Sequence, residues 1–138
     1  MKSVRLLAAV TAATAALVLS ACGGGAAPAG GPTLSADAEK YASLKGDAAK
    51  GATAFSQTCS ACHGPDGTGV EGLGKNLVTS DFAKGMPDAE LILFLTKGRP
   101  SSDPLNSTGV DMPPKGGNPA LKDQDLADIV AYLRTLEK

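Results

Sequence analysis

The 138-residue sequence contains no tryptophan, one histidine and three cysteines, and these shortages limit the chemistry open to it. The single histidine, His63, excludes any metal site within one chain that needs two histidine ligands. A structural zinc site needs four Cys or His ligands, so it would consume every such residue in the chain. A zinc knuckle is therefore a weak alternative.

The numbers of positively and negatively charged residues are nearly equal. Thirteen Lys and Arg residues face fourteen Asp and Glu residues, which gives a formal net charge of −1. Lys2 and Arg5 lie in an N-terminal leader, and its removal would lower the charge to −3. The sequence therefore predicts neither nucleic-acid binding nor a basic membrane-surface helix.

The most informative run that is present is Cys59-Ser60-Ala61-Cys62-His63. A C-x-x-C-H run is the attachment signature of a c-type haem, in which the two thiols add to the two porphyrin vinyl groups. The histidine that follows is placed to ligate the iron from the proximal side. A redox dithiol is the other alternative, but no βαβ pattern surrounds the run. We therefore predict one covalently bound haem c per chain.

The scarcity of aromatic residues agrees with this prediction. Three Phe and two Tyr are few for a chain of this size, and such a chain has a thin core of its own. A buried porphyrin would supply the missing flat apolar surface.

The N-terminus has the pattern of a bacterial lipoprotein leader. A positive start is followed by an apolar stretch over residues 6–19, which is too short to span a membrane. It ends in Leu-Ser-Ala before Cys22, which resembles a lipobox. We predict a signal peptide at 1–21, lipidation of Cys22, a flexible Gly/Ala/Pro-rich tether at 22–33 and one domain at 34–138. An ordinary signal cleaved after Ala21 is the alternative.

The remainder of the sequence contains the end signals and apolar patterns of several helices. Asp47 is a suitable N-cap, and an amphipathic pattern of apolar residues marks the C-terminal helix. The expected segments are helical turns in 35–43, helices over 48–59 and 87–97, and a structureless loop over 98–120. A last helix is expected with Asp123 and Asp125 in its first turn and Lys138 near its end. The run 91–95 alone would also suit a buried strand, but the flanking helix signals favour a helix.

Two methionines remain as candidates for the sixth iron ligand after the initiator is set aside. Met112 and Met86 both precede proline, which holds the preceding residue extended. Met112 lies in the long loop that we expect to cover the second haem face, whereas Met86 lies at a helix start and suits the core. We predict Met112 as the ligand, with an open or lysine-bound iron as the alternative.

These residues together resemble the class I c-type cytochromes over about residues 46–136. The motifs that carry the resemblance are Gly51-x-x-x-Phe55-x-x-x-Cys59, the C-x-x-C-H run, Met112, and Ile129-Val130-Ala131-Tyr132-Leu133. The resemblance implies an all-α cytochrome c fold in which about three to five helices wrap around one covalent haem.

The resemblance also assigns roles to individual residues. Gly51 and Phe55 would contact the last helix at Ile129 and Tyr132, and Leu77 would line the haem pocket. The carbonyl of residue 75 would accept a hydrogen bond from the histidine ligand, although Lys75 stands where many relatives have proline.

Arg99 is open to two interpretations, a partner for a haem propionate or a solvated surface charge. Four lysines could steer an acidic partner toward the haem edge or simply aid solubility: Lys75, Lys84, Lys97 and Lys115.

The function that these expectations define is electron transfer by a monomeric carrier, not catalysis. Its partners would be redox proteins such as a membrane oxidase, reductase, dehydrogenase or photosynthetic reaction centre. The lipid would hold it in a bacterial cell envelope on the outer side of the cytoplasmic membrane, with the outer membrane as the alternative. A gas sensor or small redox enzyme with an open sixth iron site is the competing function.

Overall fold

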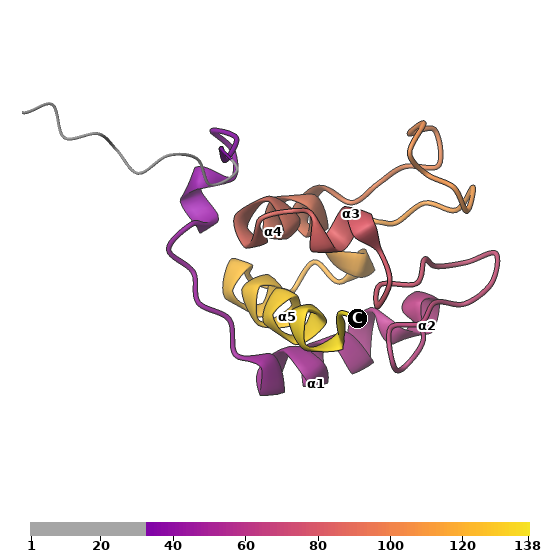
Figure 1. Cartoon of the computed structure of the whole chain (residues 1–138), viewed down its shortest axis with the longest axis horizontal. Helices are drawn as coiled ribbons and strands as arrows, with labels where there is room; N and C mark the ends of the chain where they lie inside the picture. Colours follow the sequence, from indigo (N-terminus) through magenta and orange to yellow (C-terminus); the bar gives the residue numbers. More distant parts are fainter. Residues whose placement is uncertain (1–32) are drawn as a thin grey trace, which may run out of the picture. The chain divides into compact units, whose positions relative to one another are not determined.

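The computed structural model describes residues 33–138 (Figure 1). The expected signal peptide, Cys22 and the tether up to residue 32 lie outside this range. The regular elements of the described residues are all helices, without a β-strand, which confirms the all-α prediction. Its elements are η1 (Glu39–Tyr41), α1 (Ala48–Thr58), α2 (Ser60–His63), α3 (Asp81–Lys84), α4 (Asp88–Lys97), η2 (Pro114–Gly117) and α5 (Asp123–Leu136).

Helix α1 begins where its cap predicts. The Asp47 side chain accepts hydrogen bonds from the backbone N–H groups of Ala49 (2.9 Å) and Lys50 (3.2 Å). The helix ends at Thr58, and the chain continues directly into α2, whose four residues run from Ser60 to His63. The C-x-x-C-H run therefore occupies a single helical turn.

Helices α1 and α5 cross in close contact. A Cβ atom added to Gly51 would lie 1.8 Å from the backbone oxygen of Asp128, so no larger residue fits without a shift of the backbone. Beside this point the rings of Phe55 and Tyr132 pack with centroids 5.4 Å apart. The predicted contact of Gly51 and Phe55 with the last helix is confirmed.

Gly51→Ala tests this crossing, because two effects of opposite sign compete there. Helix propensity alone would stabilise α1 by about 1 kcal/mol. The clash with α5 backbone is the larger effect, and we expect a net loss of roughly 2–4 kcal/mol in the free energy of unfolding. Denaturant unfolding of the holoprotein measures it. Gln57→Ala, on the exposed side of α1, is the control and should change stability by less than about 0.5 kcal/mol; a stabilised Gly51→Ala protein would contradict the argument.

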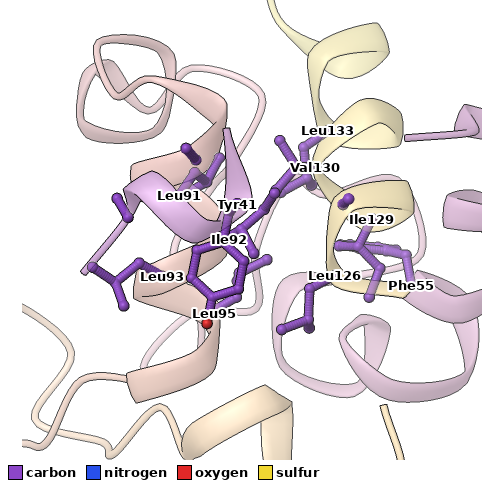
Figure 2. Close-up of a cluster of buried hydrophobic side chains, with 13 residues drawn as sticks. Tyr41, Phe55, Leu91, Ile92, Leu93, Leu95, Leu126, Ile129, Val130 and Leu133 are labelled. Carbon is purple, nitrogen blue, oxygen red and sulfur yellow. The ribbon is translucent and has the colours of Figure 1, made fainter. Parts of the chain in front are cut away.

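Helix α4 resolves the ambiguity of the apolar run 91–95. Acidic residues occupy its first turn, and Gly98 ends it with φ 71°, a conformation that glycine adopts without strain. Four of the five side chains in the run are buried, and they belong to one hydrophobic cluster with side chains of α5 (Figure 2). Burial on several sides explains why the run lacks a clear amphipathic period.

The segment before α1 packs on α4. Tyr41 is only 2% exposed, and its hydroxyl lies 3.3 Å from that of Thr96. Asp37 forms a 2.9 Å ion pair with Lys97 at the end of the same helix. The helical turns expected over 35–43 are present in shortened form, as the 3₁₀ turn η1.

The prediction of a structureless loop over 98–120 is wrong in part. The segment contains η2 and an antiparallel bridge between Arg99 and Met112. Helix α3 was also not predicted, because its four residues are too few to show a period; only the Ser80 cap, which accepts from the Ala83 N–H at 3.2 Å, marks it.

Candidate functional site

A cavity of about 380 Å³ lies inside this fold. Its lining includes core side chains from α1, α4 and α5, together with residues of the loops after α2 and α4. The six site residues proposed from the sequence all line it: Cys59, Cys62, His63, Leu77, Arg99 and Met112. The sequence therefore identifies residues that the fold brings together from three separate segments.

The cavity also suits a large apolar ligand. Leu73, Phe82, Leu105 and Val110 are between 36% and 68% exposed, and all four line the cavity. Large apolar side chains gathered at one opening are typical of a ligand site. A flat apolar group bound between them would cover these side chains, so the residues present fit a porphyrin.

His63 has a fixed ring orientation. Its Nδ1 atom lies 2.8 Å from the carbonyl oxygen of Lys75, a geometry in which Nδ1–H donates and Nε2 is left to bind a metal. The lysine carbonyl thus makes the hydrogen bond expected at this position despite the absence of proline. The loop that carries it is tightly packed, since a Cβ on Gly74 would lie 2.2 Å from the Cys62 carbonyl oxygen.

The cysteines are free thiols in a partly buried setting. Burial, and in second place the nearby Cys62, raise the pKa of Cys59 to about 11. In the protein without its cofactor this thiol is therefore protonated at neutral pH.

Met112 and Met86 have different environments, as predicted. Met112 lines the cavity, and its backbone is paired with that of Arg99 by two hydrogen bonds of 2.8 Å. Met86, like Met112, is partly buried against the hydrophobic core, but it does not line the cavity, and its carbonyl accepts a hydrogen bond from Arg134.

Arg99 is not a solvated surface charge, so that interpretation is wrong. Its side chain is 17% exposed, and its guanidinium carbon lies over the rings of Phe82 (4.4 Å) and Phe94 (4.9 Å). Asp103 lies 3.3 Å from Nε. No sequence pattern predicts this pair of rings around Arg99, because Phe82 belongs to the short α3 and Phe94 to a fully apolar run.

A second cavity, of about 640 Å³, is wider open and more polar. It lies over the loop 68–81 and contains no Cys, His or Met side chain. Across residues 33–138 no group of three or more His, Cys, Asp and Glu side chains could hold a metal ion.

None of the helices found in residues 33–138 has the length and apolar character required to cross a membrane.

A helical fold that gathers a C-x-x-C-H turn and a methionine around an apolar cavity defines a haem-binding electron-transfer protein. Comparison with known proteins agrees. The model of the family described as Cytochrome c matches residues 48–137. Cytochrome c-555 of Prosthecochloris aestuarii is 29% identical over 98 residues, which cover 71% of this chain and 91% of that protein. No solved structure matches the chain.

The chain therefore belongs to the cytochrome c family and is a class I c-type cytochrome. Membership implies a covalently bound haem c with its iron and a role in electron transfer.

Proposed function

We propose that this chain is a lipid-tethered electron carrier. In this proposal Cys59 and Cys62 form the thioether bonds to the haem, and His63 and Met112 ligate its iron. The observation that carries the assignment is that all four side chains line one apolar cavity. The described residues contain one histidine, and their second methionine, Met86, does not line this cavity.

The haem iron supplies a reversible one-electron change between its ferrous and ferric states. The chain's residues determine how readily that change occurs. The Lys75 carbonyl orients the His63 ring and increases its basicity, while the Met112 thioether favours ferrous iron and raises the reduction potential. The apolar walls exclude water, and Leu77 contributes to them.

Arg99 is proposed to lie beside a haem propionate. Its guanidinium is already held by two aromatic rings and Asp103 at the cavity wall, so little side-chain freedom is lost when a propionate binds.

A carrier with both axial positions filled should not bind small molecules. We expect the reduced wild-type protein to bind carbon monoxide slowly or not at all, because Met112 would have to leave the iron first. Stopped-flow spectroscopy after mixing with carbon monoxide measures this. Rapid, saturating binding would instead support the gas sensor or small redox enzyme with an open sixth site.

The tether is proposed on the sequence before the described domain. Cys22 follows Leu-Ser-Ala at the end of an apolar stretch and is the single cysteine outside the haem motif. Lipidation there would hold the domain at the outer side of the cytoplasmic membrane, provided that more than one acyl chain is attached.

Cys22→Ser is expected to move the protein from the detergent phase to the aqueous phase in phase partitioning of cell extracts. Ala27→Ser, within the same tether, is the control and should remain in the detergent phase. Unchanged partitioning of Cys22→Ser would place the anchor elsewhere, and an unmodified Cys22 at the mature N-terminus would favour ordinary signal cleavage.

The partners are proposed to be redox proteins that exchange electrons with a monomeric domain. Of the four lysines considered for steering, Lys84 and Lys97 form ion pairs with Asp81 and Asp37. Lys75 and Lys115 line the haem cavity, and Lys115 Nζ donates to the Leu121 carbonyl at 2.6 Å. Lys75 is therefore the best candidate to attract an acidic partner. Identification of the membrane complexes that co-purify with the native protein would test the choice of partner.

A further inference from the structure

The segment from Arg99 to Met112, called here the Met loop, begins and ends at one narrow neck. Arg99 and Met112 donate backbone hydrogen bonds to each other, both of 2.8 Å. The approach is close enough that a Cβ on Gly98 would lie 2.3 Å from the Met112 carbonyl oxygen. Beyond the neck, the Ser101 N–H donates to the Asp111 carboxylate at 2.5 Å. The backbone position of Met112 thus depends on how the two limbs of this loop are held together.

The Asn106 side chain links both limbs of the Met loop. Its Nδ2 group donates to the carbonyl of Pro100 (3.2 Å) on the first limb and to that of Val110 (2.7 Å) on the second. Its Oδ1 atom accepts from the backbone N–H groups of Thr108 (3.1 Å) and Gly109 (3.0 Å) and from the Thr108 hydroxyl (3.2 Å). One amide therefore satisfies donors and acceptors from both sides of the loop.

The Met loop buries few of its side chains within the protein chain itself, and Leu105 and Val110 would be covered only by the bound haem. Leu105, its largest apolar side chain toward the tip, is 68% exposed. Ser101, Ser102 and Ser107 are exposed as well. A loop without an apolar core of its own depends on its hydrogen bonds, and Asn106 makes more of them than any other side chain in the Met loop.

We propose that Asn106 is a positioning residue for Met112: it ties the two limbs of the Met loop together and so keeps the methionine on the iron. Asn106 also lines the haem cavity, but it acts through the backbone, because its Nδ2 group donates to the carbonyls of Pro100 and Val110 within the loop. The inference rests on the proposed ligation of the iron by Met112.

The test compares full-length holoprotein variants. Asn106→Ala removes the whole set of hydrogen bonds. Asn106→Asp keeps the acceptor for Thr108 and Gly109 but replaces the donors with oxygen opposite the Pro100 and Val110 carbonyls. Both variants should increase the rate of carbon monoxide binding to the ferrous protein by about tenfold or more, since a tenfold change corresponds to the loss of one or two net hydrogen bonds. The far-red charge-transfer band of the oxidised protein should also disappear at a lower temperature.

Ser102→Asp is the matched control. It places the same negative charge on an exposed position of the Met loop, at a side chain that makes no hydrogen bond among residues 33–138. It should shift the reduction potential as any nearby charge does, while the carbon monoxide rate and the charge-transfer band stay as in wild type. Thr108→Val removes the hydroxyl that bonds to Asn106 and to the backbone of Val110 but leaves both Asn106 donors in place. It should give a smaller change in the same direction and serves if the Asn106 variants do not mature.

The results of these measurements distinguish a positioning role of Asn106 from a direct effect of Asn106 on the cofactor. Wild-type carbon monoxide rates in Asn106→Ala or in Asn106→Asp would overturn the proposal, because the ties between the limbs are its basis. A shifted potential with an unchanged band and rate would also overturn it, since Asn106 would then act directly on the cofactor. Met112→Ala is measured in parallel: if that variant keeps the band, the failure lies in the assignment of the ligand and not in the role of Asn106.

Discussion

Met112→Ala is expected to lower the reduction potential of the haem by on the order of 100 mV or more and to open the iron to carbon monoxide. The thioether stabilises ferrous iron, and its removal leaves the sixth position to water or to no ligand. The weak far-red charge-transfer band of methionine-to-iron ligation should vanish from the oxidised protein. Redox titration, absorption spectroscopy and carbon monoxide binding measure these three effects on one sample.

Met86→Ala is the matched control for this experiment. Met86 packs against the core and does not line the cavity, so its loss should reduce stability while leaving the potential, the band and the closed iron site unchanged. If Met86→Ala removed the band and Met112→Ala spared it, the ligand assignment would be reversed.

The parts of this site that the sequence predicts are those with local signals. The C-x-x-C-H spacing defines its own helical turn, the Asp47 cap marks the start of α1, and the proline after Met112 marks an extended residue. The spacing of apolar residues in α5 predicts both the helix and the face that it buries. Each of these signals is complete within a few neighbouring residues.

The environment of Arg99 could not be predicted in the same way. Its cage consists of one ring from α3 and one from α4, and no spacing in the sequence relates either ring to Arg99. The ties made by Asn106 are similar, because a turn signal at Asn106 does not reveal which carbonyls its amide will reach. No pattern in the stretch Ser101–Thr108 therefore predicts a function, whereas its hydrogen bonds indicate one.

The haem cavity also determines how stable the chain can be without its cofactor. Its lining includes Phe55, Leu91, Leu126, Ile129 and Leu133, which belong to the hydrophobic core (Figure 2 shows these side chains together). The core and the haem site therefore share their walls. Without the haem, these apolar walls around a volume of about 380 Å³ lose their packing partner or face water, and both reduce stability. A small domain has a total stability of about 5–15 kcal/mol.

The double variant Cys59→Ala/Cys62→Ala is therefore expected to lack a cooperative thermal transition once it is free of haem. Cofactor binding energy stabilises the folded state directly, and both covalent attachments are lost in this variant. Acid–acetone should extract any haem from it, whereas wild type should retain its haem and show a mass higher by one haem. Circular dichroism during heating measures the transition, and Ser60→Ala, inside the same motif, is the control that should keep both haem and transition. A haem-free double variant that melts sharply near the midpoint of the holoprotein would show that the helices pack without the cofactor.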